Sequence, residues 1–381
     1  MISAPAVAAA FTLLAAPAAA LPTPGPHAPS EPAPSSSAAD GTWFHHVIFQ
    51  VGEKLGGCAI GDLDPGHPGN EVVAVAADGR VYLARGKSNH WVTETIFEAP
   101  GEMIQCAIGD ADPRRPGNEL VLVGTSEGRE DDGNGGLALM VWREGKEWKS
   151  RTLFESPALI HACAIADLDP TSEGNEIYLG GFDQVVWQAS FLEDDSVDIG
   201  LVCPVRGPVK SLVPLGDELA IACADGRLML GNRLALGWSA RPLDEADAGQ
   251  ARLGVLDGRL ITARDDGKLL LVDAQARSQA IYGEDDKLRG AALGDLVPDR
   301  PGPEAATVGY EARLTVLTES RGSWQPRTVF TDEAPLHHLA IGELVEESPG
   351  LELVTCGYSG RLVLAGLDYR GSGLAPDSGG D

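Results

Sequence analysis

The chain has 381 residues, and 56 Asp plus Glu against 29 Lys plus Arg give it a formal net charge of -27. That charge predicts a surface that repels phosphate backbones, so nucleic acid is excluded as an expected partner. The 47 Gly, 26 Pro and aromatic fraction of only 6% favour an all-β fold of short strands over one with long helices.

The first forty residues predict export and a linker rather than a folded domain. Residues 1–20 form an apolar run that ends in small residues, typical of a signal peptide cleaved near Ala20, although its first residues include no Lys or Arg. Pro17 and the high alanine content argue against a stable membrane span. Residues 21–40 are mostly Pro, Ser and Ala, which predicts a disordered linker. We therefore expect a secreted or periplasmic protein.

One segment recurs along the chain and defines a repeat. It reads CAIGDLDPGHPGNEVVAV from Cys58, CAIGDADPRRPGNELVLV from Cys106 and CAIADLDPTSEGNEIYLG from Cys163. Weaker copies begin at Ala291 and Leu339. Each copy places two acidic residues at the same spacing: Asp62/Glu71, Asp110/Glu119, Asp167/Glu176, Asp295/Glu304 and Glu343/Glu352.

Each repeat predicts a four-stranded unit. In the first copy the strands are expected over Gly57–Asp62, Glu71–Ala76, Arg80–Ala84 and His90–Phe97, with a hairpin turn at Asp78-Gly79. Two degenerate copies, from Ser211 and Arg252, keep Asp-Gly turns but shorten the first loop. The units are expected to begin near residues 55, 103, 159, 207, 249, 287 and 335, which makes seven.

The two ends of the array complement each other. The last copy stops after three strands, while TWFHHVIF at Thr42–Phe49 resembles the fourth strands HWVTETIF, EWKSRTLF and SWQPRTVF. A first segment that joins the last sheet removes exposed strand edges. The sequence therefore predicts an all-β, seven-bladed β-propeller of four-stranded antiparallel blades over residues 41–368, closed by the N-terminal strand, with a disordered tail at 369–381.

Three of the six cysteines, Cys58, Cys106 and Cys163, occupy the same position in successive repeats. That periodicity favours free thiols packed as small buried hydrophobic side chains. Disulfide pairing is the alternative for an exported protein.

The segments of the IGDLDPGHPGNEVV type resemble FG-GAP/VCBS repeats, at the level of the repeat plan and over roughly residues 41–368. The resemblance implies calcium binding in the first loop through a D-x-[DN]-x-D-G-x-x-D pattern. This sequence departs from that pattern, because Gly66 replaces the fifth-place carboxylate and Asn70 the ninth. The calcium candidates are Asp62, Asp64, Asp110, Asp112, Asp167 and Asp169. The alternative, which we favour, is that each Asp caps its own turn by accepting backbone N–H bonds.

The loops opposite the acidic ones are expected to converge around the propeller axis, where ligand sites usually form. Aligned at the start of each first strand, the repeats read Gly56-Gly57, Ile104-Gln105, His161-Ala162, Ser211-Leu212, Ala251-Arg252, Arg289-Gly290 and His337-His338. Turns on the same face add Phe182-Asp183, Tyr310-Glu311 and Tyr358. We assign Arg252, Gln105, His338, Phe182, Asp183, Glu311 and Tyr358 to ligand binding.

Two functions of different class fit this arrangement. The first is an exported, monomeric binding module for a carbohydrate or protein ligand. The second is a sugar lyase, dehydratase or isomerase, an analogy that the resemblance implies, with His161, His337, Arg289 and Tyr310 as catalytic residues. In the second case His161 and His337 would hold a divalent transition metal, or one imidazole would act as general base. A scaffold that only presents loops, such as Gly128 to Gly136, is a third possibility. Signatures of hydrolases and nucleotide-binding enzymes do not occur.

Overall fold

The computed structural model describes residues 42–87, 90–126, 135–273, 275–345, 348 and 350–368. Within these residues every regular element is a strand, from β1 to β28, and no helix is long and apolar enough to cross a membrane. The predicted signal peptide, linker and C-terminal tail lie outside the described residues, as does most of the loop from Gly128 to Gly136.

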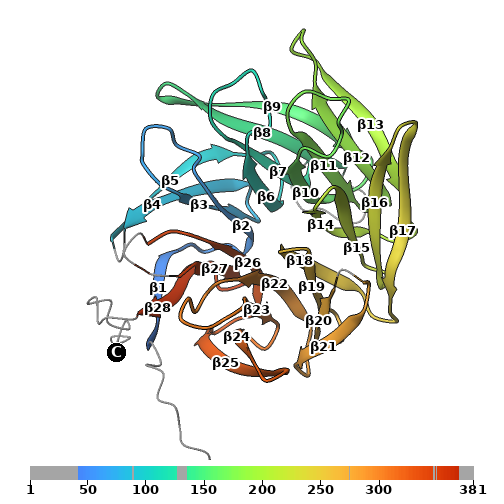
Figure 1. The fold of residues 1–381 in the computed structure, drawn as a ribbon. Helices are drawn as coiled ribbons and strands as arrows, with labels where there is room; N and C mark the ends of the chain where they lie inside the picture. Colours follow the sequence, from blue (N-terminus) through green and yellow to red (C-terminus); the bar gives the residue numbers. More distant parts are fainter. Residues whose placement is uncertain are drawn as a thin grey trace, which may run out of the picture. The chain divides into compact units, whose positions relative to one another are not determined.

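The strands form seven four-stranded antiparallel sheets arranged in a ring (Figure 1). The first three sheets are β2 (Leu55–Gly61), β3 (Glu71–Ala76), β4 (Arg80–Lys87) and β5 (His90–Glu98); β6 (Met103–Gly109), β7 (Glu119–Thr125), β8 (Gly136–Glu144) and β9 (Glu147–Ser156); and β10 (Ile160–Ala166), β11 (Glu176–Gly181), β12 (Val185–Phe191) and β13 (Val197–Pro204).

The fourth to sixth sheets follow the same order from the axis outwards. They are β14 (Val209–Leu215), β15 (Glu218–Cys223), β16 (Arg227–Leu234) and β17 (Gly237–Glu245); β18 (Gln250–Leu256), β19 (Arg259–Arg264), β20 (Lys268–Val272) and β21 (Ser278–Gly283); and β22 (Leu288–Gly294), β23 (Glu304–Gly309), β24 (Arg313–Ser320) and β25 (Ser323–Thr331).

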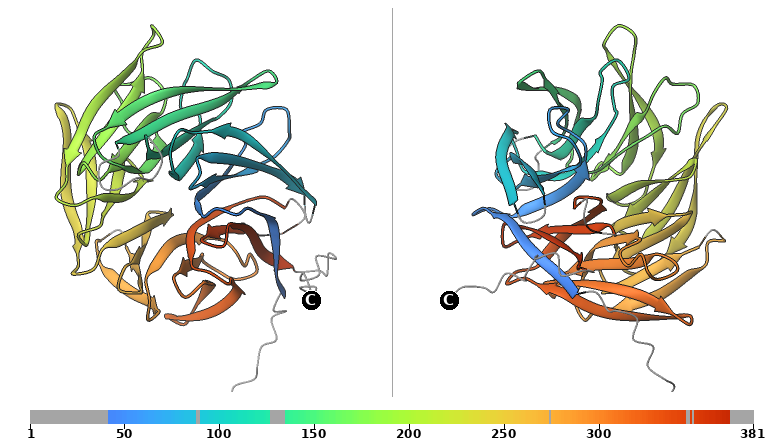
Figure 2. Two further views of the ribbon diagram at one scale, coloured as in Figure 1. Left: turned by 180° about the vertical axis from the view of Figure 1, so that it is seen from behind. Right: turned by 60° about the vertical axis from the view of Figure 1, so that its left-hand side comes forward.

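The seventh sheet closes the ring with strands from both ends of the chain. It contains β26 (Leu336–Gly342), β27 (Glu352–Gly357), β28 (Arg361–Asp368) and β1 (Thr42–Gln50). β1 pairs antiparallel with β28 from Thr42↔Asp368 to Gln50↔Arg361, and Figure 2 shows the two strands side by side. The predicted closure is confirmed, and the chain forms a seven-bladed β-propeller.

Burial explains why the second strands are apolar and the fourth strands alternate. All six residues of β3 are buried, because neighbouring blades cover both faces of the strand. The outermost β5 is buried at few positions and has the alternating pattern of a half-exposed strand. Each hydrophobic cluster joins two blades; one contains Val73 and Leu83 of the first blade with Leu122 of the second. All six cysteines are buried free thiols in these clusters, and for Cys58, Cys106 and Cys163 this confirms the prediction from the repeat spacing.

Some predicted strand ends were wrong by a few residues. The first strand of the first blade runs from Leu55 to Gly61 rather than from Gly57 to Asp62, because a bulge lets pairing begin earlier. The third strand continues to Lys87 rather than Ala84, because its hairpin partner stays in register up to Lys87↔His90.

The repeated acidic pair has a structural role that its spacing alone did not reveal. The second member is a buried glutamate whose Oε2 accepts two backbone N–H bonds across the first loop; Glu71 accepts them from Leu63 at 2.9 Å and Asp64 at 3.0 Å. The same pair of bonds occurs at Glu119, Glu176, Glu304 and Glu352. These carboxylates hold the loops because buried N–H groups need acceptors.

In three of these loops the asparagine before the glutamate joins the loop to the preceding blade. The side chains of Asn118 and Asn175 donate to the backbone oxygens of Asp62 and Asp110, at 2.7 and 2.6 Å. Asn70 donates to the backbone oxygen of Glu343 in the last blade, at 2.9 Å. The third of these bonds therefore crosses the junction at which the ring closes.

Candidate functional site

A β-bulge in every first strand positions the candidate site. Pairing between the first and second strands skips one residue in six blades, at Gly56, Ile104, His161, Lys210, Arg289 and His337, and skips Ala251 and Arg252 in the fifth. An unpaired bulge residue is turned away from the regular pleat. Those of the third to seventh blades line one axial cavity.

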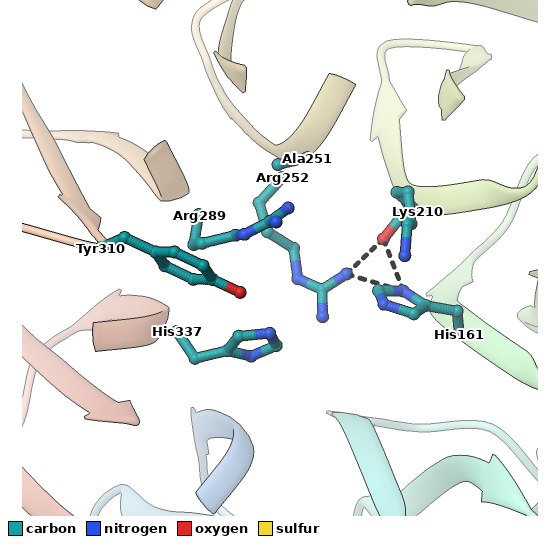
Figure 3. Close-up of a pocket in the computed structure, with 7 residues that line it drawn as sticks. All are labelled: His161, Lys210, Ala251, Arg252, Arg289, Tyr310 and His337. Atoms are coloured by element: carbon teal, nitrogen blue, oxygen red, sulfur yellow. Dashed lines mark hydrogen bonds between the residues drawn. The ribbon is translucent and has the colours of Figure 1, made fainter. Parts of the chain in front are cut away.

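The axial cavity has a volume of ≈ 160 Å³ and is lined by His161, Lys210, Ala251, Arg252, Arg289, Tyr310 and His337 (Figure 3). Arg252 is only 6% exposed. Its Nη1 donates to the backbone oxygen of Lys210 and lies 3.0 Å from His161 Nδ1. Its Nε and Nη2 have no hydrogen-bond partner among the described residues. A buried guanidinium with unused donors thus lies beside the cavity.

The two histidines of the cavity are held by backbone carbonyls. His161 Nδ1 lies 3.1 Å from the oxygen of Lys210, and His337 Nδ1 lies 3.0 Å from the oxygen of Gly56. Burial, reinforced by nearby cations that include Arg252, holds the pKa of both imidazoles well below the usual range. Both rings are therefore neutral at pH 7, and the fixed positive charge comes from other groups.

Lysine and arginine side chains supply that charge. Burial and the neighbouring Arg252 and Arg289 lower the pKa of Lys210 to about 8. Burial lowers the pKa of Arg252 to about 10, so it stays charged at neutral pH. Arg289 is paired with Asp265 at 2.7 Å. The cavity therefore holds more cations than carboxylates.

Aromatic side chains stand at the mouth of the cavity. Phe182 and Tyr358 are 41% and 44% exposed. The Lys210 ammonium lies 4.8 Å from the centre of the Phe182 ring, and Tyr310 Oη lies 3.3 Å from Tyr358 Oη. Burial opposes ionisation of Tyr310, but the Tyr358 hydroxyl and Arg289 outweigh it and lower its pKa. The mouth thus offers ring faces beside cations.

The structure brings together most of the residues assigned from the sequence. His161, His337, Arg289, Tyr310 and Arg252 line the cavity, with Phe182 and Tyr358 close to these residues.

Besides Phe182 and Tyr358, four assigned residues do not line the cavity. His338 lies 3.4 Å from the backbone nitrogen of Cys58, and burial lowers its pKa to about 3. Gln105 is buried in β6. Asp183 accepts a bond from Trp187 Nε1 at 2.8 Å, and Glu311 accepts one from a neighbouring backbone amide. His338 joins two blades, and Asp183 and Glu311 hold turns. Gln105 Oε1 has no hydrogen-bond partner among the described residues.

Sequence reasoning missed Lys210. The alignment placed Ser211-Leu212 at the position that Lys210-Ser211 occupies, one residue too late. The fourth blade has lost the long first loop that fixes the register of the clearer copies, so its spacing could not reveal the shift. The bulge between Val209 and Ser211 identifies the equivalent residue.

The second aspartate of each calcium-candidate loop faces an arginine. Asp64 is buried and paired with Arg85, at 2.7 Å, and with Arg143. Asp169 is paired with Arg233 at 2.9 Å. Burial opposes ionisation of Asp169, but bonds from Thr171 and Arg233 outweigh it and lower its pKa to about 2.

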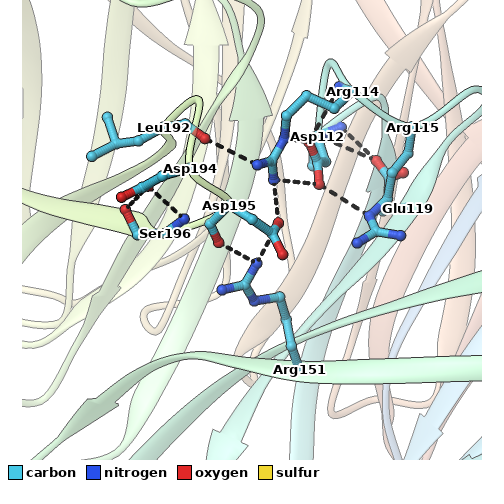
Figure 4. A network of polar contacts seen from close by, with 10 residues as sticks. Asp112, Arg114, Arg115, Glu119, Arg151, Leu192, Asp194, Asp195 and Ser196 are labelled. Carbon is cyan, nitrogen blue, oxygen red and sulfur yellow. Dashed lines mark hydrogen bonds and ion pairs between the residues drawn. The ribbon is translucent and has the colours of Figure 1, made fainter.

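In the second blade, Arg114 and Arg115 contact the carboxylate of Asp112 at 2.7 and 3.0 Å, and Arg114 continues to Asp195 of the next blade (Figure 4). The first aspartates of the loops, Asp62, Asp110 and Asp167, are exposed. The described residues contain no group of three or more His, Cys, Asp or Glu arranged to hold a metal ion. Calcium binding stays a prediction.

Comparison with solved structures shows the fold. The chain is similar to the crystal structure of the WD40 β-propeller domain of Doa1, with a TM-score of 0.61 and 12% sequence identity over 84% of this chain and 96% of that chain. This protein, with its seven four-stranded sheets, is a seven-bladed β-propeller. No protein-family model and no curated protein matches the sequence. The fold generally serves as a ligand- or protein-binding scaffold, so the ligand must be argued from the axial cavity.

Proposed function

We propose that this β-propeller is a binding module whose axial cavity takes up the carboxylate of an acidic carbohydrate. One observation supports the proposal above all others: Arg252 is buried with two guanidinium nitrogens unpaired beside the cavity. Arginine matches a carboxylate with two parallel hydrogen bonds, and a buried charge without a partner is costly. A bound carboxylate would supply both the partner and the missing negative charge.

The aromatic mouth favours a sugar ring as the remainder of the ligand. Phe182 and Tyr358 expose flat faces next to cations, and such faces suit ligands that are apolar on one side and polar at the edge. The FG-GAP/VCBS resemblance and the expected export support a carbohydrate encountered outside the cell. A protein ligand that inserts its C-terminal carboxylate is the competing outcome.

The alternative of a metal-assisted enzyme receives less support from this cavity. Lys210, Arg252 and Arg289 share the cavity with the two imidazoles, and their charges repel a divalent cation. Two imidazoles without a carboxylate also make a poor ligand set for a catalytic metal.

Calorimetric titration with digalacturonate, and with the neutral disaccharide of the same linkage, tests the proposal. We expect the wild type to bind only the acidic sugar. Arg252→Met should weaken that binding about 10- to 150-fold, the equivalent of losing a hydrogen bond to a charged group. Arg327→Met, on the exposed face of β25, is the matched control and should bind normally.

Equal binding of the acidic and neutral sugars would refute the carboxylate site. Binding confined to peptides with a free C-terminus would replace the carbohydrate with a protein ligand.

A further inference from the structure

Lys210 is a cavity-lining lysine that lies close to other cations, an arrangement that anion binding alone does not require. Its β-bulge turns it into the cavity, where Arg252 and Arg289 lie nearby. Its ammonium forms no ion pair with a carboxylate of the described residues. By contrast, the exposed Lys268 is paired with Asp266 at 3.4 Å. A lysine crowded by cations and partly desolvated loses its proton more easily than an exposed one, which makes its amine a nucleophile.

We propose that Lys210 condenses with the carbonyl group of a 2-oxo acid to form an imine while Arg252 holds the neighbouring carboxylate. The inference rests on the proposed carboxylate site and specifies its ligand class. In a 2-oxo acid the reactive carbonyl is bonded directly to the carboxyl carbon, so one small ligand presents both groups. Acidic sugars in their open-chain form include members of this class.

The reaction is balanced without an oxidant or reductant. The neutral amine of Lys210 attacks the carbonyl carbon, a C–N bond forms, and the π electrons of the C=O bond move to oxygen. That oxygen then leaves as water with the two hydrogens that the nitrogen has given up, and the nitrogen lone pair forms the C=N bond. His161 and His337, whose rings are neutral, are placed in the same cavity to relay a proton to the leaving oxygen.

Reductive trapping tests the inference on the full chain. Pyruvate, the smallest common ketone of this class, is added with borohydride, which fixes an imine as a stable secondary amine, and modified lysines are mapped by mass spectrometry. We expect one predominant adduct at Lys210, little at Lys268, and a trapping rate that rises between pH about 6 and 8. Lys210→Arg, which keeps the charge, should lose the adduct, and Lys268→Arg should not.

A parallel titration with oxamate separates this inference from the proposed function, because oxamate has the carboxylate of pyruvate but an unreactive amide carbonyl. Suppression of the Lys210 adduct by oxamate supports both. If oxamate binds but pyruvate forms no adduct at Lys210, the imine proposal is overturned and the carboxylate site stands. Failure of both ligands overturns both. Adducts spread evenly over surface lysines, or retained in Lys210→Arg, also overturn the imine.

Discussion

The buried guanidinium of Arg252 sets the character of the cavity. A buried donor without a partner costs about 1–3 kcal/mol, and more when it is charged. Two nitrogens of Arg252 and the Nε of Arg289 are buried without a hydrogen-bond partner. Local costs of this kind concentrate at functional sites, where a ligand relieves them.

Arg252→Met should lose ligand affinity without losing stability. Replacing a buried, incompletely paired ion with an apolar side chain of similar length is often neutral or stabilising. His161 Nδ1 remains within reach of the Lys210 carbonyl, so that acceptor keeps a partner. We expect a thermal midpoint equal to or above that of the wild type in differential scanning calorimetry. A midpoint several degrees lower would indicate that Arg252 is a structural residue.

Affinity for an acidic ligand should depend on pH through Lys210 rather than through histidine. The pKa of Lys210 is about 8, so its ammonium is half protonated near that pH, mostly charged a pH unit below it and mostly neutral a pH unit above it. The two cavity imidazoles are neutral near pH 7. We therefore expect digalacturonate affinity to stay nearly constant between pH about 6 and 7.5 and to fall above about 8. An affinity that rises steeply as the pH falls through 6.5 would contradict this assignment.

Among the elements, the first loop of each clear repeat is held by a buried glutamate. Glu119 accepts bonds from the backbone nitrogens of Ala111 and Asp112, at 2.9 and 3.1 Å. Burial raises its pKa from 4.5 to about 7 despite these bonds. The folded protein therefore prefers the protonated carboxyl, and the contribution of Glu119 to stability decreases as the pH rises from about 4.5 through 7.

Glu119→Gln should consequently gain stability relative to the wild type as the pH rises. The glutamine oxygen can still accept both backbone bonds, and the amide does not ionise. We expect the difference in unfolding free energy between variant and wild type to be on the order of 1–3 kcal/mol more favourable at pH 8 than at pH 5. Urea unfolding at both values measures it, with the exposed Glu319→Gln as control. An equal difference at both pH values would argue against ionisation of a buried Glu119.

At the scale of the whole molecule, stability depends on closing the ring. Thr42 faces Asp368 in an antiparallel pair, so the first and last residues of the propeller are already placed like the arms of a hairpin. The side chain of Asn70 spans the same junction. Without β1, the seventh sheet would instead expose the edge of β28 to other chains.

Two circular permutants test whether the ring is stabilised by a first strand that completes the last sheet or only by the covalent order of the blades. Both join Asp368 to Thr42 by a short loop. One opens at Gln275 in the β20–β21 turn, so that its new first strand again completes the last sheet; the other opens at Gly207, between blades. We expect the first to melt within a few degrees of the wild type and the second to melt lower. Equal melting of the two permutants would show that the exchanged strand is not what stabilises the ring.

Local signals in the sequence were sufficient to predict the fold, because the repeats and turns recur at a fixed spacing. The sequence specified seven units, buried cysteines and a first strand that completes the last sheet, and it pointed to His161, His337, Arg252 and Arg289 at the axis. Which residues enter the cavity depends on the packed structure, because a β-bulge shifts the alternation of side chains by one residue. In a degenerate repeat, such as the one that contains Lys210, no sequence pattern shows where the bulge lies. The packed structure also decided the role of the acidic loops. Whether a carboxylate faces an ion, an arginine or a backbone amide depends on chain segments that are brought together only when the blades pack.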